Sequence, residues 1–404
     1  MRWSFLSAAM LVVACAPATV APLAAPAFPQ PLAIAEATSS AFARQILVPT
    51  PTLAIAATAT AAPTDKQLAP SLAPTPSTAP TLTFAPTLAP TVAPTIAPAP
   101  TPAATPYDPP FLGPVIAKDY PDPGLLIAAG AFYAFATNAN GRNVQASVST
   151  DLVHWRDLPD ALPALPSWAR PGFTWAPEVT QIGGTYVMYF TARHAPSGRQ
   201  CIGAATAASP AGPYRPRGDV PLVCEPQFGG SIDPYPFVDS DGVRYLVWKT
   251  DSNAIGTPTV IKMGRLAADG LSFLTIPTAL IANDLPWEGA VVEAPTLVRR
   301  GATYVLFYSA NDYSGPAYAV GVATATSLAG PWVKSPRPIL ASADGRIGPG
   351  GETIGVIGDD TWMLYHAWSA SGPYREMRIA RVVWDGARPT VVPATVSSLA
   401  RITP

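Results

Sequence analysis

Three acids in the sequence stand in short proline-containing phrases, and their carboxyls could act together in one reaction. Asp122, Asp233 and Glu293 lie in YPDPG, SIDPYPF and VEAPT, respectively. Carboxyls brought into one pocket perturb each other, so that one can stay protonated while another is ionised. Cleavage of a glycosidic bond needs this division, because one carboxyl protonates the leaving oxygen while the other activates water or attacks the sugar.

Each phrase also has a simpler interpretation as a turn. An acid before proline commonly accepts hydrogen bonds from backbone amides, as in many Asp-Pro turns. Two further acid phrases, around Glu178 and Glu352, bring the number to five. Turn chemistry explains any one phrase well, but it explains five phrases in register less well. The sequence therefore predicts that each repeat places one acid at the same position.

The element that accompanies every phrase is an aromatic β-run. The lead aromatics of these runs are at positions 133, 186, 245, 304 and 362, so they are spaced 53, 59, 59 and 58 residues apart. Strand-rich repeats of this period are typical of β-propellers. We predict an all-β, five-bladed β-propeller with an axial active site. The acids should lie on or just before the innermost strand of each blade.

Composition limits the partners of the chain. The 404 residues carry a net charge of −1, and only 13% of them are charged. Nucleic acid is excluded as a partner, because phosphate binding needs a basic surface. Residues 1–15 contain Arg2, a short apolar stretch and Cys15, an order that resembles the signal of bacterial lipoproteins. The alternative is an ordinary signal peptide cleaved elsewhere, with Cys15 incidental.

The rest of the chain divides by composition into two parts. Residues 16–106 are rich in proline, threonine and alanine, and they are expected to form a disordered linker that cannot bury a core. Residues 107–404 are expected to form the propeller domain. We expect an exported monomer, either a cell-surface lipoprotein or a secreted protein. It would contact a membrane only through an N-terminal lipid anchor.

Four phrases occur in order, one per predicted blade: YPDPG, WAPEV, DPYPFVD and EAP. Together they resemble glycoside hydrolase family 43, and the resemblance covers residues 107–393. It implies a five-bladed propeller in which Asp122 is the general base and Glu293 the general acid of an inverting reaction. Asp233 would hold the acid in place and keep its pKa raised. The base and acid carboxyls would be roughly 6.5–9.5 Å apart, which leaves room for water.

Several other side chains could contact a sugar. Trp175 could stack on a sugar face or lie in the core, and Trp287 could shape a subsite wall. Arg375 resembles a family arginine that reaches the sugar, and Arg378 is its rival. Glu178 is expected to bond a neighbouring loop and is not assigned to catalysis.

The histidines and cysteines bear on metals and cross-links. Many family members have a histidine after Gly-Pro-Gly that helps to hold a calcium ion or water, whereas Gly351 stands there in this chain. A channel Ca²⁺ is therefore in doubt, and no cofactor or metal is expected to be required. His366 is expected along a core strand. Cys201 and Cys224 are expected to form a disulfide, which export permits, with two buried thiols as the alternative.

The resemblance implies an enzyme that acts on an oligo- or polysaccharide through its α-L-arabinofuranosyl linkages, as an arabinofuranosidase or arabinanase. A β-xylosidase of the same family is one alternative. The others are a retaining enzyme related to invertases, a non-catalytic carbohydrate-binding propeller and a structural adhesin head. The presence of all three acids weighs against a non-catalytic propeller.

Overall fold

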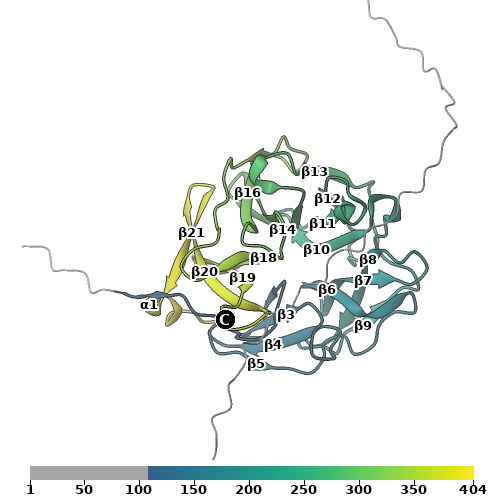
Figure 1. The fold of residues 1–404 in the computed structure, drawn as a ribbon. Helices are drawn as coiled ribbons and strands as arrows, with labels where there is room; N and C mark the ends of the chain where they lie inside the picture. The colour runs from purple at the N-terminus through teal and green to yellow at the C-terminus, as the bar shows by residue number, and fades with distance from the viewer. Residues whose placement is uncertain (1–107) are drawn as a thin grey trace, which may run out of the picture. The chain divides into compact units, whose positions relative to one another are not determined.

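The computed structural model describes residues 108–404, which form a closed ring of five β-sheets (Figure 1). Each sheet is one blade, and its four main strands follow one another in chain order. The predicted all-β, five-bladed propeller is therefore confirmed. The predictions for the signal, for the linker and for Cys15 lie outside the described residues. No helix between residues 108 and 404 has the length and apolar character needed to cross a membrane.

The strands of blades 1 to 4 share one arrangement, with four strands in each blade. They are β2 (Gly124–Ala128), β3 (Ala131–Ala136), β4 (Gln145–Ser149) and β5 (Arg156–Asp157); β6 (Ala169–Ile182), β7 (Thr185–His194), β8 (Gln200–Ala207) and β9 (Arg215–Arg217); β10 (Ser231–Val238), β11 (Arg244–Thr250), β12 (Val260–Arg265) and β13 (Thr278–Ala282); and β14 (Val292–Arg300), β15 (Thr303–Ala310), β16 (Ala319–Ala325) and β17 (Val333–Lys334).

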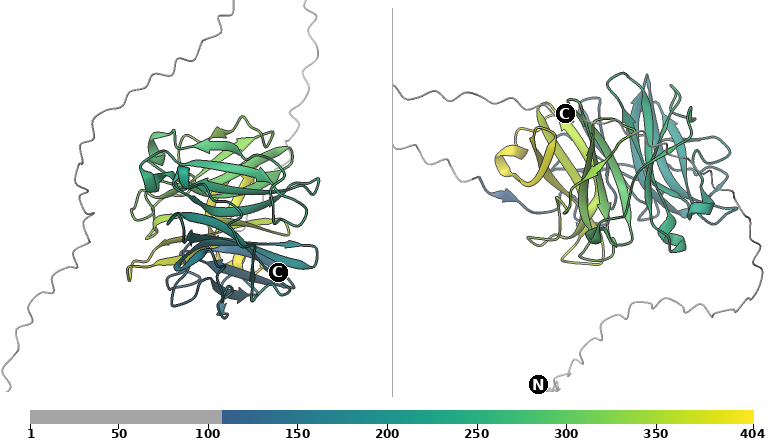
Figure 2. Two further views of the ribbon diagram at one scale, coloured as in Figure 1. Left: turned by 90° about the vertical axis from the view of Figure 1, so that its right-hand side faces the viewer. Right: turned by 90° about the horizontal axis from the view of Figure 1, so that it is seen from above.

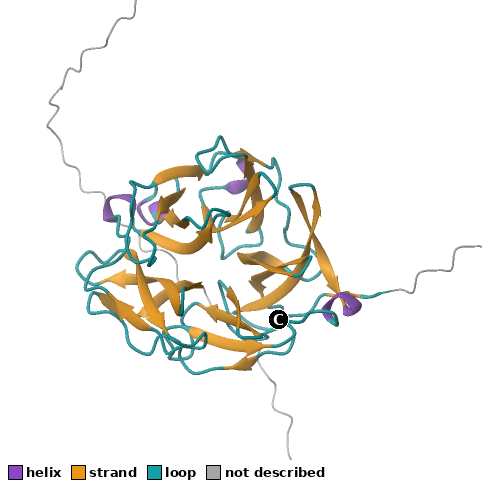
Figure 3. Cartoon of the chain, turned by 180° about the vertical axis from the view of Figure 1, so that it is seen from behind, coloured by secondary structure: helices purple, strands orange, loops and turns teal. Residues whose placement is uncertain are grey.

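Blade 5 has a fifth strand, which comes from the N-terminal end of the described chain. It contains β18 (Ile347–Ile357), β19 (Asp360–Trp368), β20 (Arg375–Asp385), β21 (Arg388–Thr395) and β1 (Pro110–Phe111). β1 pairs with β21, and the short helix α1 (Val396–Leu399) follows. The innermost strands β2, β6, β10, β14 and β18 each contact the next, and β18 contacts β2. Figures 2 and 3 show the ring from the side and from behind.

The second strand of every blade is the aromatic run identified in the sequence. In β15, every residue after Thr303 is buried. Because neighbouring blades cover both faces of these strands, the runs are continuously apolar rather than alternating. Small residues in the third strands make room for aromatic rings of the same blade. A Cβ on Gly203 would lie 2.8 Å from ring atoms of Phe190 and Trp168.

At one axial position on or just before its innermost strand, each blade has a residue in the left-handed region of backbone space, which we call its left-handed residue; Gly172 in β6 and Gly348 in β18 also have positive φ angles. The φ angles are 53°, 41°, 56°, 48° and 57° for Asp122, Ala176, Asp233, Ala294 and Gly351, respectively. In β6, β10, β14 and β18 the strand register shifts at this point. A non-glycine residue in this region costs about 1–3 kcal/mol, and such positions cluster at functional sites. The strained positions therefore mark the axis as a candidate site.

The left-handed residues also correct the prediction that every acid occupies the same position. Asp122 and Asp233 are themselves left-handed residues, whereas Glu293 comes one residue before the left-handed residue of its blade. Glu352 comes one residue after it, and Glu178 two residues after it. The prolines obscured this shift in the sequence, because proline follows the left-handed residue in four blades while the acid changes place around it.

Candidate active site

A pocket of about 400 Å³ opens at the axis, lined by residues from all five blades. Its volume lies within the range of about 300–1,000 Å³ that is common for small-molecule sites. Each blade contributes one acid from the neighbourhood of its left-handed residue: Asp122, Glu178, Asp233, Glu293 and Glu352. The structure thus brings the three predicted acids into one cavity and adds Glu178 and Glu352 from the axial positions, while Asp251 also lines the pocket.

Asp122 is held as an ionised carboxylate. The Thr137 hydroxyl donates to Oδ2 at 2.7 Å, and Nη1 of Arg375 lies 3.5 Å from Oδ1. Burial opposes ionisation, but the Arg375 charge, the neighbouring His366 ring and the Thr137 hydroxyl more than offset it and hold the pKa of Asp122 well below its usual range. The side chain is 22% exposed, so water can reach it. Asp122 is suited to accept a proton.

Asp233 and Glu293 form a carboxyl pair with the opposite property. Burial and the charge of Glu293 raise the pKa of Asp233 to about 8. Oε2 of Glu293 accepts from Nζ of Lys249 at 2.8 Å, and Oε1 accepts from the Tyr318 hydroxyl at 2.8 Å. The pair therefore retains one proton near neutral pH. One pocket contains an ionised carboxylate from blade 1 and a proton-bearing pair from blades 3 and 4.

Four of the five blade junctions are joined by the same hydrogen bond near the axis. A side chain near the end of the second strand accepts the backbone N–H of the left-handed residue in the next blade. The acceptors are Thr137 for Ala176 at 3.0 Å, Thr191 for Asp233 at 3.2 Å, Ser309 for Gly351 at 2.8 Å and His366 for Asp122 at 3.1 Å. These bonds tie the position of each axial acid to the neighbouring blade.

The remaining junction is different because the second strand of blade 3 places Lys249 at this position, and an ammonium group cannot accept a hydrogen bond. The Ala294 N–H donates to Oδ2 of Asp233 instead, at 2.9 Å. Lys249 is only 1% exposed, yet the charges of Glu293 and the neighbouring acids outweigh its burial and raise its pKa. Asp233 thus holds the main chain next to Glu293, while Lys249 contacts the carboxylate.

The two additional acids are neutral members of the pocket. Burial raises the pKa of Glu178 to about 8 and that of Glu352 to about 8. The Ser309 hydroxyl donates to Oε2 of Glu352 at 2.6 Å. Near neutral pH both carboxyls are protonated, in contrast to Asp122. Glu178 lines the pocket and is not confined to contacts with a neighbouring loop.

The predicted sugar-contacting residues separate into two groups. Trp175 and Arg375 line the pocket, whereas Arg378 is buried against Glu376 and donates to the backbone of Leu112. Arg375 is therefore the arginine that reaches the pocket. Its guanidinium also lies 5.0 Å from the ring centroid of Tyr313, which sequence reasoning missed and which is 49% exposed at the pocket.

Trp287 does not shape a wall of this pocket, and the sequence-based assignment is wrong. Its ring stacks on Tyr308 with centroids 6.0 Å apart, inside the core between blades 3 and 4. A Cβ on Gly321 would lie 2.7 Å from the Trp287 ring. Proximity to Glu293 in sequence was misleading, because Trp287 belongs to a short 3₁₀ turn, Pro286–Glu288, that packs away from the axis.

His366 lies on β19 and is fully buried, but its ring reaches the axial site. Nδ1 lies 3.1 Å from the backbone nitrogen of Asp122 and 3.2 Å from its Oδ1. A Cβ on Gly351 would lie 2.5 Å from the imidazole. The space next to position 351, where many family members have a histidine, is therefore filled by a ring from the neighbouring strand.

His366 alone does not supply a calcium site. Ca²⁺ takes six to eight oxygen ligands. His366 offers only its Nε2 atom, which has no hydrogen-bond partner within residues 108–404. Within residues 108–404, three metal-ligating side chains lie close together in blade 2, namely His194, Cys201 and Cys224, and no such group lies at the axis.

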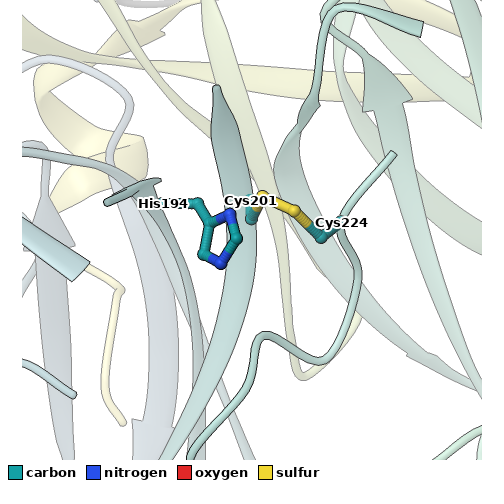
Figure 4. Close-up of side chains that lie close together, drawn as sticks. All are labelled: His194, Cys201 and Cys224. Atoms are coloured by element: carbon teal, nitrogen blue, oxygen red, sulfur yellow. A yellow bond between two sulfur atoms is a disulfide. The ribbon is translucent and has the colours of Figure 1, made fainter. Parts of the chain in front are cut away.

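The blade 2 group is a disulfide with a neighbouring histidine (Figure 4). Cys201, on β8, is bonded to Cys224, and their Cα atoms are 4.6 Å apart. The two sulfurs are therefore unavailable as thiolate ligands. His194 instead contacts the hydroxyl of Ser197 at 2.9 Å. The bond cross-links a loop of 23 residues in sequence.

Comparison with known proteins identifies the family. The model of glycosyl hydrolases family 43 matches residues 111–387, which is nearly all of the described propeller. The chain belongs to this family. A solved structure described as a thermostable family-43 glycoside hydrolase superimposes with a TM-score of 0.64 at 28% identity, and it covers 69% of this chain and 94% of that chain.

Two curated relatives of the family-43 chain have named activities. The extracellular endo-α-(1→5)-L-arabinanase 2 of Bacillus subtilis is 28% identical over 33% of this chain and 33% of its own length. The extracellular exo-α-(1→5)-L-arabinofuranosidase of Streptomyces avermitilis is 27% identical over 52% of this chain and 48% of its own length. The chain thus spans less than half the length of these two relatives.

Sequence reasoning missed Lys249, His366 and Tyr318 as members of this family-43 site. A signal for the first two was present, because each aromatic run ends in a polar residue that is out of place in a buried strand. Tyr318 follows a loop between β15 and β16 and carries no such signal. Its role depends on the contact with Glu293, which only the fold reveals.

Proposed function

We propose that this family-43 protein is an inverting glycoside hydrolase that cleaves α-L-arabinofuranosyl linkages in an oligo- or polysaccharide. The observation that carries the proposal is the pairing of an ionised Asp122 with a proton-bearing Asp233–Glu293 pair in one axial pocket. Inverting hydrolysis needs one carboxylate and one protonated carboxyl at the same time. The two named relatives, an arabinanase and an arabinofuranosidase, support the choice of sugar.

In the proposed reaction Asp122 removes a proton from a water molecule, whose oxygen attacks the anomeric carbon. The bond between that carbon and the leaving oxygen breaks, and Glu293 gives its proton to the leaving oxygen. Asp233 positions Glu293 through the Ala294 N–H, and the one proton that the pair holds is on Glu293 when the bond breaks. Arg375 holds Asp122 ionised, and Trp175 offers its ring as a stacking surface for a sugar.

The test of the substrate is a comparison of three compounds with the purified chain. Aryl α-L-arabinofuranoside, aryl β-D-xyloside and linear α-(1→5)-arabinan would be incubated with equal amounts of protein. We expect hydrolysis of the arabinofuranoside and of arabinan. Hydrolysis of the xyloside alone would assign a β-xylosidase instead. A folded chain that bound arabinan or xylan but cleaved none of the three would be a carbohydrate-binding propeller.

The proposal predicts a decline of activity at alkaline pH. The general acid works only while the Asp233–Glu293 pair holds its proton, and this proton is lost as the pH rises through about 8. Asp122 stays ionised in mildly acidic solution, because its pKa is lowered. The kcat/KM for arabinan should therefore be level between about pH 5 and 7 and should fall with a midpoint near 8. A fall centred near pH 5 would contradict the proton-bearing pair.

Activity is expected not to depend on a bound metal, because no three metal-ligating side chains of residues 108–404 converge at the axis. Dialysis against EDTA is expected to leave kcat on arabinan unchanged, and added calcium is expected not to raise it. A loss of activity that calcium restores, with magnesium as the comparison, would show that the enzyme needs the ion.

Export to the cell surface completes the proposal, in line with the extracellular relatives. Cys15 would be acylated and would anchor the catalytic domain through residues 16–106, and the enzyme would act as a monomer. A Cys15→Ala variant should move from the membrane fraction to the medium or to the soluble fraction. Equal distribution of wild type and variant would favour a secreted protein with an ordinary signal peptide.

A further inference from the structure

A pair of stacked rings lies between the proposed base and the proposed acid. The rings of His366 and Tyr318 have centroids 5.8 Å apart and an interplanar angle of 11°. On one side, Nδ1 of His366 accepts the backbone N–H of Asp122 at 3.1 Å. On the other side, the Tyr318 hydroxyl donates to Oε1 of Glu293 at 2.8 Å. A continuous chain of contacts therefore runs from Asp122 to Glu293.

Two consecutive glycines of β18 make room for this stack. A Cβ on Gly350 would lie 2.1 Å from Cε1 of Tyr318, and a Cβ on Gly351 would lie 2.5 Å from the His366 ring. Both rings are almost completely buried, with His366 at 0% and Tyr318 at 1% exposure. Rings enclosed in this way have little freedom to move, so the stack is a rigid spacer.

A ring that accepts the backbone N–H of the left-handed residue occurs at one described junction, the one between blades 5 and 1. Thr137, Thr191 and Ser309 accept the equivalent backbone N–H with a short hydroxyl side chain. Only His366 uses a ring for this purpose among the described junctions, and this ring extends beyond the acceptor atom to the face of Tyr318. The junction with the proposed base is therefore the one that also reaches the proposed acid.

We propose that the His366–Tyr318 stack fixes the separation of Asp122 and Glu293, and that both rings are positioning residues for the hydrolysis. The inference rests on the proposed function, because it assigns the stack to an acid and base that act on opposite sides of one bond. Inversion needs a gap that admits a water molecule together with the sugar. A displacement of about 1 Å in such a site can cost about 100-fold in rate.

The test separates the hydroxyl of Tyr318 from its ring. Tyr318→Phe removes the hydrogen bond to Glu293 and keeps the stack, whereas Tyr318→Leu removes both. His366→Phe keeps a ring next to Tyr318 and removes the acceptor for the Asp122 N–H. The matched control is Tyr189→Phe, which removes a buried hydroxyl that donates to the carbonyl oxygen of Gly270, away from the axial pocket. For each, kcat and KM would be measured on linear arabinan and on the aryl glycoside that the wild type cleaves.

The substrates report on different groups, because an aryl leaving group needs little protonation and arabinan needs much. Tyr318→Phe should lower kcat on arabinan about 10-fold or more and change kcat on the aryl glycoside by less than about 3-fold. Tyr318→Leu should also lower kcat on the aryl glycoside by about 10- to 100-fold, because the His366 ring that positions Asp122 loses the ring it stacks on. His366→Phe should lower kcat on both substrates by similar factors, and Tyr189→Phe should change neither.

Equal aryl-glycoside kcat for the Phe and Leu variants at position 318 would overturn the proposal, because the ring would then have no effect on the base. If thermal melting shows that Tyr318→Leu does not fold, His366→Ser decides, because serine removes the ring and offers the hydroxyl acceptor used at other junctions. A loss of kcat on the aryl glycoside in this variant supports the stack, and wild-type kcat overturns it. An inert wild type would refute the proposed function itself, and this inference with it. Active wild type with unaffected variants would refute the stack alone.

Discussion

Replacing Glu293 with glutamine is expected to lower kcat on linear arabinan by about 100- to 10,000-fold, the range that general acid catalysis contributes. Glutamine keeps the size of the side chain and an acceptor for Tyr318, but it has no proton to give. The loss on an aryl α-L-arabinofuranoside should be much smaller, because that leaving group departs without protonation. The unequal loss on the two substrates, measured by initial rates, identifies Glu293 as the acid.

The matched control for this variant is Glu225→Gln. Glu225 also pairs with a lysine, Lys262, and both side chains are only about one-sixth exposed, at 15% and 16%. It does not line the axial pocket. The control should lower the melting temperature and leave kcat unchanged. Parallel losses on arabinan and the aryl glycoside in Glu293→Gln would contradict its role as general acid and would indicate a loss of the site as a whole.

Replacing Asp122 with asparagine is expected to lower kcat on both substrates by similar factors of about 100- to 10,000-fold. Activation of water is needed whichever group leaves, so the quality of the leaving group should not matter. Asparagine is the informative replacement because Asp122 has a φ of 53°, and asparagine tolerates the left-handed region better than other residues of this size. The variant therefore tests the charge of the carboxylate with little change in backbone strain.

Asp344→Asn is the control for the second variant. Asp344 also has a positive φ, of 51°, but it is exposed and does not line the axial pocket. The substitution there should alter neither kcat nor the melting temperature. If Asp122→Asn kept wild-type activity on the aryl glycoside and lost it only on arabinan, Asp122 would serve the leaving group, and the assigned roles of the two acids would have to be exchanged.

The fold could be predicted from the sequence because each blade repeats the same local solution. Strands such as β7, β11 and β15 lie between neighbouring blades and must be apolar on both faces. Every repeat therefore contains a nearly continuous run of aromatic and apolar residues. The prolines beside Asp122 and Asp233 marked the innermost segments. Repetition therefore disclosed the number of blades and the part of each blade that faces the axis.

The details of the pocket could not be predicted because they depend on contacts between blades. The position of each acid relative to the left-handed residue decides how its side chain is placed, and this position differs between Glu293 and Glu352. The sequence does not show which residue of each phrase is left-handed. Lys249 and His366 act across a blade junction on residues more than forty positions away. Trp287, in contrast, is close to Glu293 in sequence and lies in the core.

The most direct measurement is the configuration of the first sugar released by the wild-type enzyme from an aryl α-L-arabinofuranoside, followed by proton NMR. A single displacement between Asp122 and Glu293 predicts that the β-anomer appears first and that the α-anomer grows in later by mutarotation. Initial release of the α-anomer would contradict the account, because retention requires a carboxylate that attacks the sugar and forms a covalent intermediate.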